Sequence, residues 1–126
     1  MIADFETRRD QAQLDAALNR WREGNAAACE QGLRQLVESR PEFVEARVQL
    51  GEWLLMQEDV AGARAQLMEA LRLNPGHAAA HHSLGLVLEA TGQTSEAQAA
   101  FQRARELEPE NGLYQLSAQP DAALSR

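Results

Sequence analysis

Two similar stretches of the sequence decide the fold. Residues 50–75 read LGEWLLMQEDVAGARAQLMEALRLNP, and residues 84–109 read LGLVLEATGQTSEAQAAFQRARELEP. Both begin with Leu-Gly and end on a proline, and Pro41 precedes Pro75 by the same interval that separates Pro75 from Pro109. This interval of about 34 residues is typical of a solenoid, in which similar units stack on one another.

Each unit predicts two helices. Leu50, Gly51 and Leu54 have the spacing of one helical face, and a second apolar stripe with the same period follows a break near Glu58. A proline then ends the second helix, because it disfavours helical geometry in the residue before it. Thr94 is expected to be the N-cap of the sixth helix. The expected helices are 10–23, 26–39, 43–57, 60–73, 77–91 and 94–107.

Small residues recur where the two helices of a unit must approach closely. Gly51 is expected to face Ala63 in the second unit. In the third unit, Gly85 is expected to face Ala97. Cys29 has the place of these alanines in the first unit, and we expect it to be buried and inert.

These features resemble the tetratricopeptide repeat over roughly residues 10–111. The first unit departs from the pattern, with Ala16-Ala17 and Arg20 in place of Leu-Gly and a large apolar residue. Terminal units of solenoids are often atypical because one side meets water. The leading tryptophan of the family is replaced in the three units by Gln13, Arg47 and His81.

The resemblance implies an all-α superhelix of three helix-turn-helix repeats within one domain, residues 1–117. The repeats are expected at roughly 10–43, 44–77 and 78–111. Leu113, Tyr114 and Leu116 predict a short capping helix at 111–117 that covers the last repeat. Residues 118–126 are expected to form a flexible tail, or the beginning of a longer parent protein.

In this family the first helix of each pair lines the concave face, and apolar residues dominate that stripe here. The stripe predicts a groove for a peptide or a helix of a partner protein, with an acidic border that includes Glu45. Alternatively, other parts of the chain cover these residues, or single exposed leucines have no role. The predicted groove residues are Leu14, Leu18, Trp21, Val48, Glu52, Met56, His82, Leu86 and Glu89. The first three of them serve either a partner or only the end of the stack.

One branch of the family binds chaperone C-terminal carboxylates through lysine, asparagine and arginine side chains on this face. Capture of a carboxylate needs such donors. At or near the corresponding places this chain has Leu14, Leu18, Val48 and Ala79. Binding of chaperone tails in that manner is therefore disfavoured.

The composition limits the other classes of function. The net charge is −7 and the pI about 4.9, which argues against nucleic acid as a partner. All 12 cationic side chains are arginines, a weak indication of a GC-rich bacterial genome. The single cysteine needs no oxidising compartment, and neither a signal peptide nor a membrane span is evident, so we expect a cytoplasmic protein without membrane insertion.

No pattern of an enzyme or of a cofactor site is present. Phosphate loops and nucleophile elbows need strands, and none is predicted. His77 and His81 are spaced as zinc ligands on a helix, with His82 beside them, but no further ligand converges on them, so we interpret them as packing and surface residues. Trp53 is interpreted as a packing residue between repeats. We expect no enzyme, no metal and no cofactor.

Two function classes stay open. The first is an interaction module that binds another protein or peptide in the apolar groove. The second is a structural protein that stacks end to end into a homo-oligomer.

Overall fold

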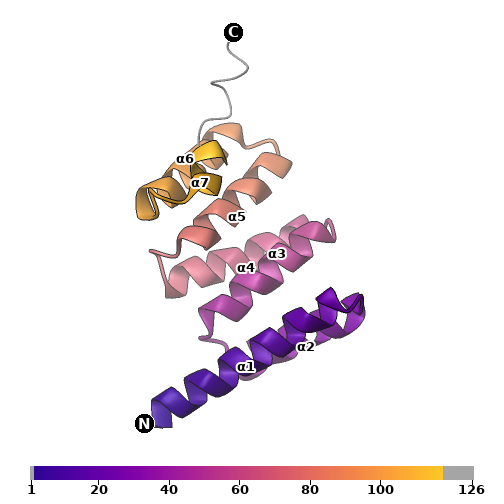
Figure 1. Ribbon diagram of the computed structural model, residues 1–126. Helices are drawn as coiled ribbons and strands as arrows, with labels where there is room; N and C mark the ends of the chain where they lie inside the picture. The colour runs from indigo at the N-terminus through magenta and orange to yellow at the C-terminus, as the bar shows by residue number, and fades with distance from the viewer. Residues whose placement is uncertain (1, 118–126) are drawn as a thin grey trace.

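The computed structural model describes residues 2–117, and every element within that range is a helix. Figure 1 shows the helices stacked in chain order from the N-terminus to the C-terminus. The tail expected at 118–126 lies outside the described residues. The helices are α1 (Ile2–Arg22), α2 (Ala26–Ser39), α3 (Val44–Met56), α4 (Val60–Leu73), α5 (Ala78–Ala90), α6 (Thr94–Leu107) and α7 (Gly112–Ser117). The all-α solenoid predicted from the repeat is thereby confirmed.

Each helix packs most extensively on its own partner, α1 on α2, α3 on α4 and α5 on α6. Successive pairs meet through α2 and α3, through α4 and α5, and through α3 and α5. One residue of each second helix, Leu33, Leu67 or Phe101, is fully or almost fully buried at the same position of the repeat. These residues fill the interior of each pair.

The glycines of the Leu-Gly motif permit this close packing. A Cβ atom on Gly51 would lie 2.8 Å from Cγ of Leu67 and 3.4 Å from the carbonyl oxygen of Ala63. A Cβ atom on Gly85 would overlap the ring of Phe101. The close approach is therefore made mainly to the large buried residue of the second helix, and only partly to the alanine that we expected.

A polar side chain stabilises the turn after each closing proline: Arg47 and His81, which replace the leading tryptophan of the repeat, and Gln115, one period further on. In each case the side chain bonds to the carbonyl oxygen of the proline that ends the preceding unit. The three pairs are Arg47 Nε with Pro41 O (2.7 Å), His81 Nε2 with Pro75 O (2.8 Å), and Gln115 Nε2 with Pro109 O (2.7 Å). Because the bond recurs at Gln115, α7 begins as the first helix of a further repeat would.

Two expectations about helix ends are wrong. The first helix begins at Ile2 and not near residue 10. Within it, Asp10 forms an ion pair of 2.9 Å with Arg40, the residue that follows α2. The N-cap of α6 is Gln93 and not Thr94. Asn25 and Asp59, at equivalent positions of the first two repeats, cap α2 and α4 through their side chains, and Gln93 has the same register without a capping bond.

The turn that follows each first helix needs a left-handed residue. Gly24 and Gly92 meet this need with φ of 85° and 79°. In the second repeat the equivalent residue is Glu58, with φ of 65°. A side chain costs about 1–2 kcal/mol in this region, so the second repeat keeps a strained turn.

Candidate peptide-binding face

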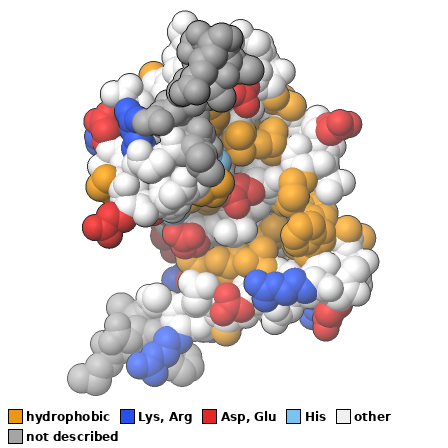
Figure 2. All heavy atoms as spheres, turned by 45° about the horizontal axis from the view of Figure 1, so that its top comes forward, with side chains coloured by type: hydrophobic (Ala, Val, Ile, Leu, Met, Phe, Trp, Pro, Cys, Tyr) orange, Lys and Arg blue, Asp and Glu red, His pale blue; other side chains and the backbone are white. Residues whose placement is uncertain are grey.

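The nine predicted groove residues lie on α1, α3 and α5, and we call the surface that carries them the candidate face. Three of its apolar residues are open to solvent: Trp21 is 47% exposed, Met56 54% and Leu86 37%. In Figure 2, hydrophobic side chains gather over the middle of the molecule with acidic side chains among them. These three residues, one from each repeat, are accessible to a partner.

Two predicted anchors are not accessible. Leu14 is 3% exposed and Val48 1%, and both belong to the main core cluster with Leu33 and Trp53. Leu18 is half-buried and packs against the same cluster. The prediction that Leu14 and Val48 line an open groove is therefore wrong, because both side chains are part of the core.

A tryptophan pair joins the first two repeats. Trp53 is buried, and the ring of Trp21 meets it edge-on, with centroids 5.8 Å apart and planes at 81°. Trp53 Nε1 donates a hydrogen bond of 2.8 Å to Glu30 Oε1 of α2. This bond lowers the pKa of Glu30, and the bond from Arg34 lowers it further by a smaller amount. The interpretation of Trp53 as a packing residue between repeats is confirmed.

Polar contacts join the second and third repeats on the candidate face. Ser83 Oγ of α5 donates to Glu52 Oε2 of α3 at 2.8 Å. His77 Nε2 lies 2.6 Å from Glu45 Oε1. Since His77 Nδ1 accepts the backbone N–H of Ala80 at 3.2 Å, the Nε2–H tautomer satisfies both contacts. We call the contact between the first and second repeats the first joint and that between the second and third repeats the second joint. The second joint thus carries two carboxylates, Glu45 and Glu52, at the solvent boundary.

The half-buried Glu52 has an unfavourable electrostatic setting. Loss of hydration raises the pKa of its carboxyl group above the ordinary value, and the nearby Glu45 adds to this shift. The bond from Ser83 opposes the shift, and His77 opposes it to a smaller extent. The carboxylate is held in place by Ser83, and its negative charge is compensated by that bond and by His77, which is itself in contact with Glu45. A positive charge brought to this point would be stabilised.

His82 packs as an aromatic residue. Its ring centroid lies 5.4 Å from that of Phe101 and 5.0 Å from that of Tyr114 on α7. Burial lowers the pKa of His82, and the exposed Glu89 opposes that shift. His82 therefore belongs to the contact between α5 and the cap, at the rim of the candidate face.

The other candidate chemistry of the sequence has structural explanations. Among the described residues, no three histidine, cysteine or acidic side chains are grouped as metal ligands would be. Cys29 is fully buried, as expected, and burial raises the pKa of its thiol. No helix in the part of the chain that the structure describes is long and apolar enough to cross a membrane.

Two of the exposed apolar residues were not expected at the surface: Leu113 was predicted to cover the last repeat, and Met68 was not singled out. Leu113 on α7 is the most exposed large apolar side chain of the described residues. It has the repeat position of Glu45 and Ala79, so continuing the register past Pro109 would have identified it. Met68 on α4 is also exposed, but its equivalents are polar and no pattern marks it.

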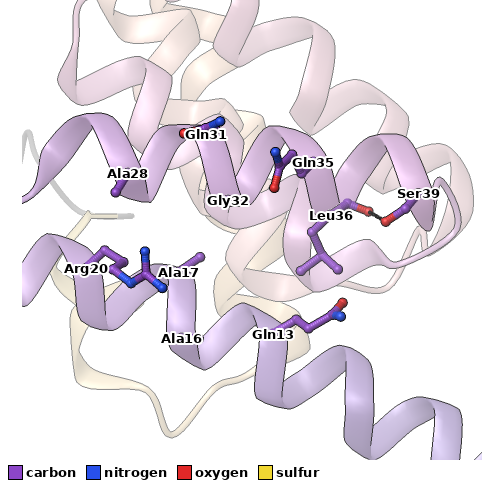
Figure 3. Close-up of a pocket in the computed structure, with 10 residues that line it drawn as sticks. All are labelled: Gln13, Ala16, Ala17, Arg20, Ala28, Gln31, Gly32, Gln35, Leu36 and Ser39. Carbon is purple, nitrogen blue, oxygen red and sulfur yellow. Dashed lines mark hydrogen bonds between the residues drawn. The ribbon is translucent and has the colours of Figure 1, made fainter.

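A cavity of about 500 Å³ lies between α1 and α2, and none of the nine residues of the candidate face lines it. Figure 3 shows Gln13 and Arg20 of α1 on one side of it, and Gln31 and Gln35 of α2 on the other. In the second repeat, the positions equivalent to Ala16 and Arg20 are Leu50 and Leu54, which are buried. The end of the stack is thus lined by small and polar side chains.

Comparison with known protein families gives two matches over most of the chain. A family model described as tetratricopeptide repeat matches residues 9–78, and a second model with the same description matches residues 54–119. None of the curated proteins matches the sequence.

Solved structures share the fold. The first TPR domain of Spaghetti (RPAP3), bound to the HSP90 peptide SRMEEVD, has a TM-score of 0.82 at 17% identity, covering 94% of this chain and 95% of that one. MamA has a TM-score of 0.78 at 20% identity, over 98% and 72%. A mutant O-GlcNAc transferase from Thermobaculum terrenum has a TM-score of 0.78 at 29% identity, over 87% of this chain but 22% of that one.

Proposed function

The chain belongs to the tetratricopeptide-repeat family, and we propose that it is a non-enzymatic module whose candidate face binds a peptide or a helix of another protein. The observation that carries the proposal is the exposure of Trp21, Met56 and Leu86, one from each repeat. Large apolar side chains gathered on one face typically mark an interaction site, and a groove between helices suits a helix or an extended peptide.

The likeness to the domain bound to an HSP90 peptide does not extend to the chemistry of the face. At 17% identity it is a likeness of fold. The peptide SRMEEVD carries three acidic residues, whereas the face of this chain carries Glu45, Glu52 and Glu89. Capture of an acidic tail needs cationic donors. We therefore propose a different class of peptide partner.

The experiment is affinity capture from an extract of the cells that produce the protein, with Leu86→Glu compared against the unmodified chain. A glutamate at an apolar anchor must be desolvated when the partner binds. We expect the affinity to fall at least tenfold, which corresponds to about 1.4 kcal/mol. Met56→Glu should act in the same way.

A matched control is available on α4, the second helix of the second repeat. Met68 on α4 is as exposed as Met56 but lies outside the candidate face. Met68→Glu introduces the same charge and should leave capture unchanged. Equal capture by Leu86→Glu and the unmodified chain, with equal helical content by circular dichroism, would remove the candidate face from consideration.

Self-assembly end to end is the second candidate. The cavity between α1 and α2 hollows the end of the stack on which a neighbouring copy would dock. However, the replacement of Leu50 and Leu54 by Ala16 and Arg20 at this end leaves little apolar area for a stacked neighbour. We therefore rank this function second.

Light scattering over a hundredfold concentration range separates the two functions. A mass of 13.9 kDa at all concentrations excludes self-assembly. A mass that grows with concentration supports it, and Ala16→Arg should then return the chain to the monomer by adding a further charge to the stacking surface.

A further inference from the structure

We propose that the segment bound by the candidate face is cationic, with arginine or lysine placed next to its apolar anchors so that it reaches Glu52. This inference rests on the proposed function and adds the chemistry of the partner. It follows from where the carboxylates of α3 and α5 lie relative to the exposed apolar residues.

The two contacts between α3 and α5 fix the order of groups along the face. Glu45 meets His77 and Glu52 meets Ser83, and the two pairs have nearly equal separations along the chain. The nearly equal offsets mean that α3 and α5 run side by side in the same direction. A segment that lies along them passes the first contact and then the second.

The exposed apolar residues lie one turn beyond Glu52. Met56 follows Glu52 by four positions on α3, and Leu86 follows Ser83 by three on α5, so each shares a helical face with its predecessor. Glu89 comes three positions after Leu86. The apolar pair is thus bracketed by the Glu52 carboxylate on one side and Glu89 on the other.

No arginine of the described residues forms an ion pair with these two carboxylates. The arginines that do form ion pairs there are matched with Glu6, Asp10, Glu30, Glu42 and Glu69. Arg22, at the edge of the face, donates instead to Asn19 at 2.7 Å. In the part of the chain that the structure describes, no arginine therefore competes with a cation of the partner for Glu52 and Glu89, and the oppositely charged neighbours that act on them are the histidines His77 and His82.

The position of Glu52 makes it the main contact for a cation. Ser83 orients its carboxylate, so little side-chain freedom is lost when a partner binds. Glu45 repels the negative charge of Glu52, and His77 offsets that repulsion in part. Burial, Glu108 and then Glu52 raise the pKa of Tyr114 on the cap. A guanidinium or ammonium group would relieve this repulsion and form charge-assisted hydrogen bonds. An acidic segment would add to the repulsion.

The test is selection from a displayed library of random peptides on the full chain, followed by affinity measurements on the enriched peptides by fluorescence anisotropy. We expect the enriched sequences to combine arginine or lysine with large apolar residues. Glu52→Gln should weaken their binding by about five- to tenfold, and raising NaCl from about 50 to about 300 mM should also weaken it. Glu38→Gln makes the same change in net charge on α2, away from the face, and should leave binding unchanged.

Different failures have different signatures. Enriched peptides without cationic residues, sensitive to Leu86→Glu but not to Glu52→Gln, would overturn the cationic partner and leave the groove in place. Binding that Leu86→Glu leaves unchanged, or the absence of any enriched peptide, would overturn the groove and the cationic partner together. Thermal unfolding of each variant establishes that the fold persists.

Discussion

The two joints between repeats have the same architecture but different chemistry. At the first, Trp53 is buried against Trp21 and bonds to Glu30. At the second, the residue equivalent to Trp53 is the small Val87, and hydrogen-bonded side chains connect α3 with α5. The repeat register therefore sets where helices meet, while the side chains decide whether a joint is mainly packed or partly polar. The polar joint carries carboxylates of the candidate face, whereas the carboxylate of the packed joint, Glu30, lies on α2 and bonds to Trp53.

The largest expected effect is at the first joint. Trp53→Ala removes a buried aromatic ring and leaves a cavity, which costs about 3–5 kcal/mol. Since the whole stability of a domain is about 5–15 kcal/mol, this variant should be severely destabilised in urea unfolding. Trp21→Ala is the matched change on the half-exposed partner ring, and it should cost about 1–2 kcal/mol, mostly the edge-on contact.

This prediction also tests the contrast between the joints. If Trp53→Ala cost no more than the variants of the second joint described below, the tryptophan pair would not dominate the first joint. The two joints would then be alike in energy despite their different side chains.

An intermediate effect is expected at the second joint. Ser83→Ala removes the donor to Glu52 and leaves a half-buried carboxylate with less compensation. The loss of such a bond costs about 1–3 kcal/mol, reduced by roughly 0.5 kcal/mol because alanine favours the helix more than serine does. Urea unfolding of Ser83→Ala, Glu52→Ala and the double variant gives the coupling between the two residues, because each single change removes the bond. A coupling near zero would contradict the role assigned to this bond.

The sequence predicts most of the helices because the register repeats. The bounds of α2 to α6 differ from those expected by at most one position. The start of α1 was missed since residues 2–9 precede the first repeat and have no copy to align with. Thr94 was preferred as a cap for its side chain, although the register of Asn25 and Asp59 indicates Gln93. The turn before α6 therefore determines which residue is the N-cap, although threonine is the better capping residue.

The sequence predicts which residues share the candidate face, but it does not predict how deeply each of them is buried. Periodicity assigns Leu14, Val48 and His82 to equivalent positions of the three repeats. The structure buries the first two in the core and packs the third against Tyr114. Burial depends on the size of side chains in the neighbouring repeat, such as Trp53, and this information lies outside the pattern of one helix. Whether the face binds a partner stays a prediction.

The smallest expected effect concerns the pH dependence of the second joint. Because burial raises the pKa of Glu52 in the folded chain above its ordinary value of 4.5, the folded state binds more protons than the unfolded state between those two values. Stability contributed at this site is therefore present below about pH 4.5 and is lost as the pH rises through the raised folded pKa.

Glu52→Gln should lack this loss, since an amide keeps the bond from Ser83 without the charge. The stability of the variant relative to the unmodified chain, from urea unfolding between pH 4 and pH 7, should increase with pH and then level off. Glu38→Gln gauges the effect of net charge alone. A variant that is less stable than the unmodified chain at pH 7 would show that the carboxylate stabilises the second joint. A more stable variant that binds cationic peptides more weakly would instead mean that Glu52 reduces the stability of the fold and serves recognition.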